Sequence, residues 1–290
     1  MISTIIATKN GEKYIARAIH NALEQSVAVS NAKDPSQFSG FEIVVVSDGS
    51  TDSTVNIVRE LALKDARIRL IELTQNIGPG AARAKGIESS KNPYIAILDD
   101  DDMWINPKKL ENQIVFMEQN TNIVAVGSEN IEFADENGKS IRWQKYRTDP
   151  KNIRNFMLMF CPIVHSSVLL RKEVYEKAGG FRDIRLAEDY DLLLRMGQLG
   201  DIANIADAEI RYTVRTNSAS ESNGRAKIKM AVAHIQLFNK YWRHYPNRTL
   251  AFVKAYARVP YQYIKSFKPV EILRQRISAL YHFFNLQRYF

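Results

Sequence analysis

Short apolar runs alternate with helical patterns through the first hundred residues. Runs rich in β-branched residues at Ser3–Thr8, Phe41–Val46, Arg67–Leu73 and Tyr94–Leu98 predict four strands. The second run is almost wholly apolar, which is typical of a strand buried on both faces of a parallel sheet. Alternating strands and helices predict right-handed βαβ units, whose ligands bind at the carboxyl ends of the strands. We therefore expect the chemistry just after the first, second and fourth runs.

Helical patterns fill the intervals between these strands. Gly78-Pro79 begins one helix, and Ser50 or Asp52 could cap another, which places Val55 and Val58 inward. The first helix has its apolar residues on one face: Tyr14, Ile15, Ala18, Ile19, Ala22 and Leu23.

The pattern changes beyond residue 102. Pro107 begins a helix, Ile123–Phe133 predicts a strand or hairpin, Asp189–Leu199 an amphipathic helix, and Ile202–Tyr212 an extended segment. From Arg225 onward the pattern is helical, with interruptions expected at the prolines in positions 246, 260 and 269.

Charge separates the end of the chain from the rest. The net charge is +8, yet residues 225–290 hold thirteen Lys and Arg against one acid, Glu271, and fourteen of the 29 aromatic residues. We expect a ligand-binding α/β half at 1–102, the other half of the same catalytic domain at 103–222, and a helical, basic and aromatic region at 223–290. Basic and amphipathic aromatic side chains together favour docking on an anionic membrane face. A helical cap with solvated charges, or nucleic-acid binding, remains an alternative.

Composition narrows the class of protein. The chain is 45% hydrophobic and 25% charged, as in ordinary globular proteins. A single cysteine, Cys161, excludes an internal disulfide framework, and five scattered histidines give no Cys/His zinc spacing. The apolar run Met1–Ala7 is too short for a signal sequence, so we expect a cytoplasmic protein.

Four consecutive aspartates, Asp99 to Asp102, follow the fourth strand. Adjacent carboxylates repel, so a run at a strand end is costly unless a cation neutralises it. A Mg²⁺ or Mn²⁺ ion shared with a diphosphate suits such oxygen ligands, with only one or two side chains holding it. The alternative is a solvated acidic loop before the next helix.

Weaker motifs follow the second and third strands. An aspartate at position 48 could accept a hydrogen bond from a base or ribose, and Gly49 would let the backbone approach a ligand. The glycine-rich segment Asn76–Gly86 lacks the Gly-Lys-Ser/Thr end of a phosphate loop. Its Arg83 could approach a nucleotide or pair with an acidic residue.

Glu188 and Asp189 open a helix after Gly179-Gly180. Carboxylates stabilise a helix N-terminus, and that alone explains most such pairs. The functional alternative is a general base beside an acceptor hydroxyl. His165 could serve catalysis, although core histidines with satisfied hydrogen bonds are more common.

In this order and at this spacing, the motifs resemble those of the large second family of inverting glycosyltransferases, which have the GT-A fold. The similarity runs from about Ser3 to Ser220. Its segments are Ser3–Asn10, Asp48–Asp52, the residues Asn76, Gly78, Ala82, Arg83 and Gly86, the metal motif within Leu98–Trp104, and Ala178–Phe181 with Glu188–Leu192. The implied fold is α/β, with a mostly parallel central sheet and flanking helices.

The resemblance implies roles for individual residues. Thr8 and Asp48 would contact the uridine of the donor, and Arg83 and Asp100 would also lie at the donor. Asp99 would lie near the ribose or sugar. Asp101, with Asp99, would bind the metal, and Asp189 would be the catalytic base. Contacts to the acceptor or the diphosphate would come from Trp104, His165, Glu188 and Arg215.

Some positions depart from the family pattern. The family usually has two acidic residues before Gly-Ser, and Ser47 replaces the first of them here. Ala84 replaces an asparagine that is common in the family, and residues 27–40 resemble an insertion. The histidine usual near Arg215 is missing.

The implied activity is metal-dependent transfer of a hexose or N-acetylhexosamine from a UDP-sugar to a glycan or lipid-linked acceptor, with Mn²⁺ or Mg²⁺. The resemblance and the basic tail together imply a role in the synthesis of a bacterial surface polysaccharide, such as lipopolysaccharide or capsule, at the inner face of the cell membrane. A sugar-phosphate nucleotidyltransferase, or a nucleic-acid-binding protein using the basic tail, is the competing interpretation. The motifs do not specify the sugar, the acceptor or the oligomeric state.

Overall fold

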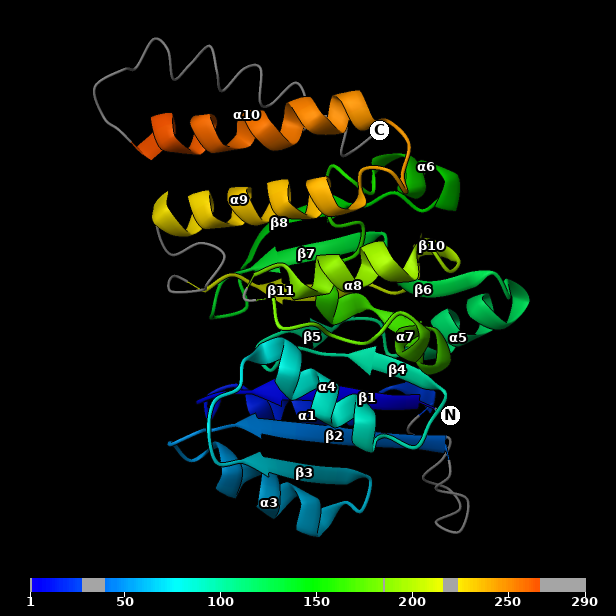
Figure 1. Cartoon of the computed structure of the whole chain (residues 1–290). Helices are drawn as coiled ribbons and strands as arrows, with labels where there is room; N and C mark the ends of the chain where they lie inside the picture. Colours follow the sequence, from blue (N-terminus) through cyan, green and yellow to red (C-terminus); the bar gives the residue numbers. More distant parts are fainter. Residues whose placement is uncertain (1, 28–39, 185, 216–223, 267–290) are drawn as a thin grey trace.

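A computed structural model of the chain describes residues 2–27, 40–184, 186–215 and 224–266. At its centre is a seven-stranded sheet with the order β10-β6-β9-β4-β1-β2-β3 (Figure 1). β9 is antiparallel to both of its neighbours, and the other neighbouring pairs are parallel. The strands are β1 (Ile2–Thr8), β2 (Phe41–Asp48), β3 (Ile68–Leu73), β4 (Tyr94–Ile97), β6 (Ile123–Ser128), β9 (Leu169–Arg171) and β10 (Asp201–Ile205).

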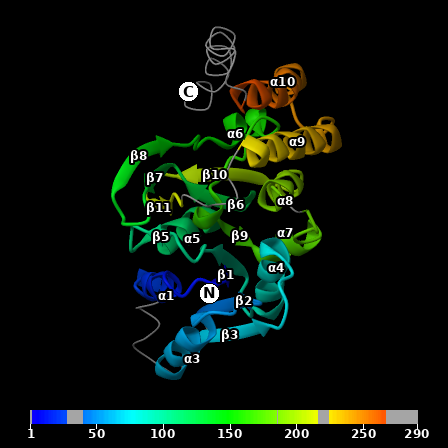
Figure 2. The ribbon, with the colours of Figure 1, turned by 90° about the vertical axis from the view of Figure 1, so that its left-hand side faces the viewer.

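Helices cover both faces of this sheet. α1 (Ile15–Leu23), α3 (Thr54–Lys64) and α5 (Lys109–Gln119) pack on one face, and α4 (Pro79–Ser89) and α8 (Glu188–Met196) on the other (Figure 2). The apolar run of β2 serves both cores, because successive side chains of a strand point to opposite faces. Val44 and Val46 belong to the core under α4 and α8, and Ile43 and Val45 to the core under α1 and α3. The predicted strand with two buried faces is confirmed.

A smaller four-stranded sheet has the order β5-β11-β7-β8. Trp104, Ile131 and Ile210 join it to the core that contains α5, on the same side of the large sheet. Its strands are β5 (Met103–Trp104), β7 (Asn130–Ala134), β8 (Ser140–Lys145) and β11 (Ile210–Thr213).

The segments predicted at Ile123–Phe133 and Ile202–Tyr212 each divide between the two sheets. β6 lies in the large sheet and β7 in the small one, so a strand is present at Ile123 as predicted, and the alternative of a hairpin is wrong. β10 pairs with β6, and β11 pairs with β7, in parallel in both cases. The two segments therefore run side by side from one sheet into the other, and Glu129 N–H donates to the Ile205 carbonyl (2.9 Å) at the crossing.

Three short helical segments lie between the strands of the two sheets. They are α6 (Pro150–Phe156), the 3₁₀ turn η2 (His165–Ser167) and α7 (Lys172–Lys177).

Two long helices, α9 (Gly224–Tyr241) and α10 (Arg248–Ser266), lie against each other beyond α8 (Figure 1). They contribute Leu237, Tyr241 and Ala255 to the core under α8. Pro260 lies inside α10, so the predicted interruption there is wrong, while Pro246 falls between the helices as expected. The predicted break at Pro269 lies outside the described residues.

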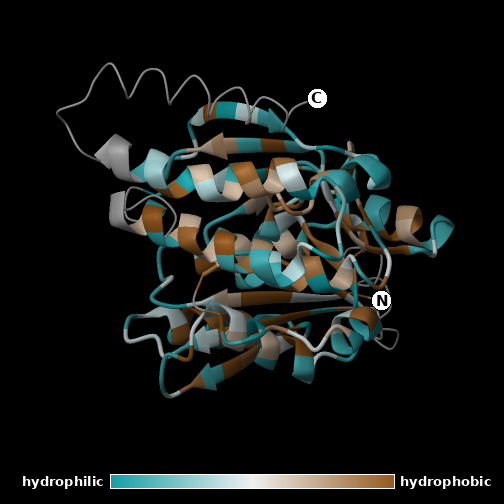
Figure 3. Cartoon of the chain, turned by 45° about the horizontal axis from the view of Figure 1, so that its top comes forward, coloured by the Kyte–Doolittle hydropathy of each residue, from teal (hydrophilic) through white to brown (hydrophobic). Residues whose placement is uncertain are grey.

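The predicted helical extension is present as far as the described chain reaches. Hydrophilic and hydrophobic residues are mixed along the C-terminal helices in Figure 3. Among the residues that the structure describes, no helix combines the length and the apolar character needed to cross a bilayer. The boundaries proposed from composition at residues 102 and 222 remain predictions.

Candidate active site

Three parallel strands deliver polar residues to one edge of the large sheet. Thr8 is the last residue of β1, and Asp48 is the last residue of β2. Asp99 is the second residue after β4, with Leu98 between them. β4, β1 and β2 are parallel neighbours in that order. Their carboxyl ends therefore lie side by side, which is where open α/β sheets bind ligands.

Thr8 holds the second aspartate of the run. Its hydroxyl donates to Asp100 Oδ2 (2.5 Å), and both side chains are buried. Gly11 lies against this pair, since a Cβ on Gly11 would fall 2.3 Å from Thr8 Oγ1 and from Asp100 Oδ2. The glycine is therefore needed here for close approach, without an unusual backbone conformation of its own.

Asp48 organises the loop before α4. Its carboxylate accepts from the backbone N–H groups of Ile77 (2.7 Å) and Gly78 (3.0 Å), and its side chain is 4% exposed. Gly49 turns the chain directly after it with a φ of 65°, in the left-handed region that favours glycine. The aspartate thus connects the end of β2 with the glycine-rich segment predicted as a separate motif.

Arg83 joins the acidic run to α8. Its guanidinium contacts Asp99 Oδ1 (2.6 Å) and Glu188 Oε1 (3.1 Å). Burial alone would raise the pKa of Asp99, but the charge and hydrogen bond of Arg83 outweigh it and the pKa falls to about 2. For Glu188, burial and the charge of Asp189 raise the pKa in spite of Arg83. Of the two alternatives predicted for Arg83, the structure shows the pairing with acidic residues.

Arg215 is the second cation at the run. It comes from the end of β11 and contacts Asp100 Oδ1 (3.2 Å) and the Asp101 carboxylate. Burial raises the pKa of Asp100 to about 6, and the charge of Asp101 adds to the rise. Burial also raises the pKa of Asp101 despite the bond from Arg215. One arginine therefore leaves this pair of carboxylates under-neutralised.

The fourth aspartate has hydrogen-bond partners of its own. Asp102 is 1% exposed and accepts from the Ser166 hydroxyl and from Thr213 N–H (2.7 Å). Burial raises its pKa well above the usual range. These contacts give Asp102 a structural part, because they attach β11 and η2 to the acidic run.

Asp189 lies in the first turn of α8, opposite the acidic run. Ala187 precedes the helix in a left-handed conformation (φ 62°), and Asp189 accepts from the N–H of Tyr190 (2.8 Å). Burial, with the charge of Arg83, lowers the pKa of His165 to about 4, so its imidazole is neutral at pH 7. The ring of Phe181 stands edge-on to that imidazole.

A pocket of about 500 Å³ contains most of the predicted residues. Its walls include acids from both sides of the site, the two arginines and the neutral histidine. The predicted residues that line it are Arg83, Asp99, Asp100, Asp101, His165, Glu188, Asp189 and Arg215. Thr8 and Asp48 lie beneath this surface, where they hold Asp100 and the loop before α4.

Trp104 lies in the core and outside the pocket wall. It is 1% exposed, its indole N–H donates to the Ser166 carbonyl (2.7 Å), and the Lys109 ammonium sits 4.5 Å from the ring centroid. This burial argues against the acceptor contact predicted for Trp104.

The acidic run suits a divalent cation in charge and in donor type. Asp99 and Asp101 both line the pocket, and Mg²⁺ and Mn²⁺ prefer oxygen ligands. Within the described part of the chain, no three His, Cys, Asp or Glu side chains form a preassembled metal site. A site of one or two carboxylates completed by phosphate oxygens and water needs no such group.

Some pocket residues carry no signal in the sequence. Cys161 and Met230 line the pocket from the loop after α6 and from α9. Ser166, which follows the pocket residue His165 in the short η2 turn, donates its hydroxyl to Asp102 and accepts from the N–H of Asp99 (3.2 Å). Their positions depend on long-range packing, so no local pattern announces them.

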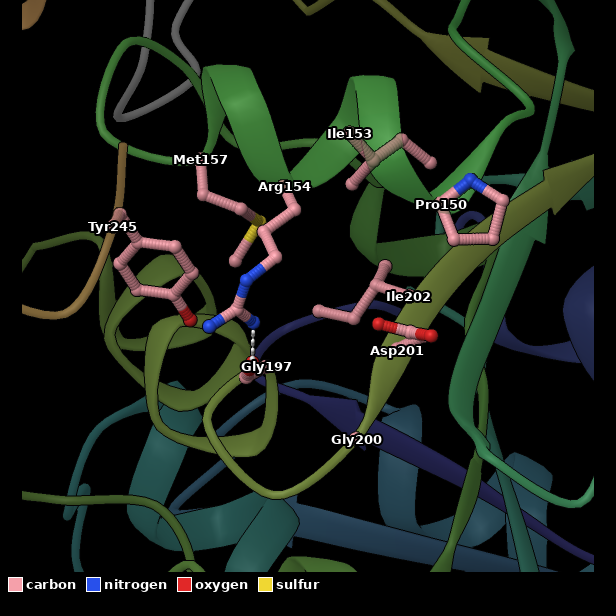
Figure 4. A pocket seen from close by; sticks show the side chains of 9 residues that line it. All are labelled: Pro150, Ile153, Arg154, Met157, Gly197, Gly200, Asp201, Ile202 and Tyr245. Atoms are coloured by element: carbon pink, nitrogen blue, oxygen red, sulfur yellow. Dashed lines mark hydrogen bonds between the residues drawn. The ribbon is translucent and has the colours of Figure 1, made fainter. Parts of the chain in front are cut away.

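A second hollow lies between α6 and the loop before β10 (Figure 4). Arg154 crosses it and donates to the Gly197 carbonyl (2.7 Å), with Tyr245 on one side. Its free volume of about 10 Å³ is about that of one water molecule. It is therefore a packing gap and not a ligand site.

Solved structures share this architecture. The mannosyltransferase PcManGT of Pyrobaculum calidifontis, in complex with GDP-Man and Mn²⁺, matches with a TM-score of 0.65 at 19% identity, over 99% of this chain and 84% of that one. The TarS 1-349 fragment of S. aureus, in complex with UDP-GlcNAc, matches with a TM-score of 0.61 at 18% identity, over 99% of this chain and 88% of that one. The fold is that of the GT-A glycosyltransferases.

Residues 3–179 match the model of Glycosyl transferase family 2, and the chain belongs to this family. An uncharacterized glycosyltransferase of Haemophilus influenzae is 28% identical over 242 residues, which cover 78% of this chain and 71% of the relative. AmsE, an amylovoran biosynthesis glycosyltransferase of Erwinia amylovora, is 31% identical over 192 residues, which cover 66% of this chain and 71% of AmsE. The protein is a glycosyltransferase, and the nucleotidyltransferase alternative is set aside.

Proposed function

We propose that this enzyme is an inverting, metal-dependent glycosyltransferase that moves a hexose or N-acetylhexosamine from a UDP-sugar to a glycan or lipid-linked acceptor. One observation carries the proposal: Asp99–Asp101 and Asp189 line the same pocket from opposite elements, the end of β4 and the start of α8. Acids at one wall suit a cation and a diphosphate, and a carboxylate at the other suits a hydroxyl that must lose its proton.

The donor is proposed to bind at the sheet edge. Arg83, Asp99 and Asp100 line the pocket directly, while Thr8 and Asp48 hold Asp100 and the loop before α4 in place. TarS and PcManGT are known in complex with UDP-GlcNAc and GDP-Man, which supports a nucleotide-sugar donor, and the choice of uridine rests on the resemblance of the motifs. Arg215 is proposed to contact the diphosphate, because it already pairs with two carboxylates beside the ion's expected position.

Asp101, with Asp99, would hold Mn²⁺ or Mg²⁺. When bound, the ion supplies positive charge that stabilises the departing diphosphate. The raised pKa of Asp101, caused by burial and the charge of Asp99, supports this assignment, because added positive charge is favourable there. The Mn²⁺ in the PcManGT complex supports it further.

The proposed reaction is a single displacement. Asp189 accepts the proton of an acceptor hydroxyl as that oxygen forms its bond to the anomeric carbon. The bond from this carbon to the diphosphate oxygen breaks, and UDP leaves with the electron pair. Because attack and departure occur on opposite faces, an α-linked donor gives a β-linked product. Glu188 positions Arg83, and the neutral His165 stands beside the sugar or acceptor.

The acceptor is proposed to be a bacterial surface glycan or its lipid-linked precursor. AmsE, which belongs to amylovoran biosynthesis by name, supports this class. Three apolar side chains of α10 are exposed: Phe252 (49%), Val253 (41%) and Tyr256 (39%). Together with the basic C-terminal region they support peripheral docking at the inner face of the cell membrane.

Substitution Asp189→Asn tests the proposed mechanism. We expect turnover to fall by about 10²–10⁴-fold, because the amide cannot accept the proton. UDP affinity with Mn²⁺ present should stay nearly unchanged. UDP release from a panel of UDP-sugars measures the first quantity, and calorimetry the second.

Asp183→Asn is the matched control, because Asp183 is an exposed acid shortly before the same helix. Unchanged turnover in Asp189→Asn would remove Asp189 from the role of base. Lack of UDP binding by the wild-type protein with Mn²⁺ would overturn the proposed donor site.

A further inference from the structure

A cavity of about 250 Å³, distinct from the gap in Figure 4, adjoins the large pocket on the side of α9 and α10. Both this cavity and the large pocket are lined by Cys161, Ala187, Asp189 and Met230. A molecule in the adjoining cavity would therefore lie against Asp189 and beside the proposed donor position. Its volume is below the range of roughly 300–1,000 Å³ for drug-sized ligands, so it suits one sugar unit with a substituent.

Basic side chains from the two C-terminal helices line this cavity, which we call the basic pocket. They are His234 from α9 and Lys254 and Arg258 from α10, and among the described residues the one acid on its wall is Asp189. Lys254 is 5% exposed, and its ammonium lies 4.5 Å from the Phe160 ring centroid. The wall is thus positive and partly desolvated, which favours a negatively charged occupant.

Arg258 is held in a specific orientation. His234 Nε2 lies 2.8 Å from the Leu158 carbonyl, which can only accept, so Nε2 carries the proton. His234 Nδ1 is then an acceptor for Arg258 Nη1 at 3.3 Å. Burial, followed by the charge of Arg258, lowers the pKa of His234 to about 4, which keeps this neutral form at pH 7.

The guanidinium of Arg258 also has a donor that is not used within the described part of the chain. Arg258 Nε is buried and has no hydrogen-bond partner among the described residues. A buried donor without a partner is costly, and a guanidinium fork matches the oxygens of a phosphate or a carboxylate.

We propose that the basic pocket binds an anionic substituent of the acceptor saccharide, a phosphate or a carboxylate, and so holds an acceptor hydroxyl against Asp189. The inference rests on the proposed function and adds the chemical class of the acceptor. A phosphate would come from a sugar-1-phosphate link to a lipid carrier or from a phosphate in the glycan, and a carboxylate from a uronic acid.

The test measures binding of small anionic sugars to the full chain by calorimetry, with UDP and Mn²⁺ at saturation so that the donor site is filled. The probes are N-acetylglucosamine 1-phosphate, glucuronic acid and, as the neutral reference, N-acetylglucosamine. We expect at least one anionic probe to bind about tenfold or more tightly than the neutral one, and the stronger of the two identifies the source of the charge.

Arg258→Gln should weaken binding of that probe by about tenfold or more, because it removes a charged donor pair. Arg243→Gln, which removes the same charge from an exposed position after α9, should leave it unchanged. Arg258→Lys keeps the charge and loses the fork, and it serves as a second variant if the glutamine variant is unfolded.

Equal affinity for the neutral and anionic probes would overturn the inference, as would equal effects of Arg258→Gln and Arg243→Gln. The UDP titration in the same samples separates the two proposals. UDP binding without selective anion binding removes only the basic pocket, whereas absence of UDP binding removes the proposed function as well.

Discussion

Asp100 and Asp101 share one guanidinium, that of Arg215, at the most crowded point of the site. Their pKa values stay raised by burial in spite of it, to about 6 for Asp100. Asp99, with Arg83 beside it, has instead a pKa of about 2. Neighbouring carboxylates in one run thus differ in pKa, because Arg83 offsets the burial of Asp99 more fully than Arg215 offsets that of Asp100 and Asp101. The charge that remains uncompensated is the part of the site that ligands can use.

At the residue scale we expect Asp100→Asn to be more stable than the wild type at pH 7 without divalent ions, by about 1–3 kcal/mol. The folded pKa of Asp100, about 6, lies above the ordinary value of 3.8. Ionisation therefore costs folding free energy as the pH rises from about 4 to about 6. The advantage of the variant should shrink toward pH 4. Denaturant unfolding at intervals across this range measures it.

Asp207→Asn, at an exposed position, is the control and should show no such pH dependence. A stability difference between Asp100→Asn and the wild type that stays constant from pH 4 to pH 7 would contradict the assignment.

At the scale of elements, the first half of the fold follows from the sequence because each strand and helix there has a complete local pattern. The second half does not. β9 has only three residues, yet it enters between β4 and β6 with the opposite direction, which no pattern in Leu169–Arg171 specifies. In the same way, the strand ends that carry the site were predictable, and so was the pairing of Arg83 with acidic residues, whereas the pairing of Arg215 was not. Arg215 reaches Asp100 across 115 positions of sequence, so only tertiary packing defines that contact.

Lys109, at the start of α5, is a further feature that periodicity missed. It is fully buried, donates to Gln113 Oε1 (2.7 Å) and lies over the Trp104 ring. Burial lowers its pKa well below the usual range. A sequence pattern places a lysine on the solvated face of such a helix, but here the neighbouring β5 covers it.

We expect Lys109→Met to raise the free energy of unfolding by about 1–3 kcal/mol near pH 6, because it removes a buried amine. The folded protein binds this proton less tightly than the unfolded chain does. Wild-type stability should therefore rise with pH toward the ordinary lysine pKa, and the advantage of methionine should shrink near pH 9. Chemical denaturation at both pH values measures the change. Lys108→Met, its exposed neighbour, should show neither effect; a loss of stability in Lys109→Met would contradict this account.

At the scale of the whole molecule, α9 and α10 are part of the enzyme's core as well as its C-terminal region. Asp191 on α8, fully buried, contacts Arg195 (2.8 Å) on its own helix, and Lys240 (3.0 Å) and the Tyr241 hydroxyl (2.7 Å) on α9. The helix that carries Asp189 is therefore tied directly to the C-terminal pair. Removing the pair would expose that core, so its contribution to membrane binding has to be tested by surface substitutions.

We expect the double substitution Phe252→Ser with Val253→Ser to weaken binding to vesicles of phosphatidylcholine and phosphatidylglycerol by about tenfold or more, because it removes apolar surface that would insert at the interface. Co-sedimentation of the full-length protein measures the partitioning. Val115→Ser removes an equally exposed side chain, 49%, from α5 and is the control. Equal partitioning of the double variant and the wild type would mean that the C-terminal helices only cap the catalytic domain.

Cys161 is the only cysteine in the chain, and it borders both the large pocket and the basic pocket. Thiol chemistry on this protein is therefore confined to the junction of the two cavities. A small electrophile attached to that sulfur would occupy space next to Asp189 while leaving the rest of the surface unmodified. The enzyme thus carries a natural attachment point for a covalent inhibitor or an optical reporter.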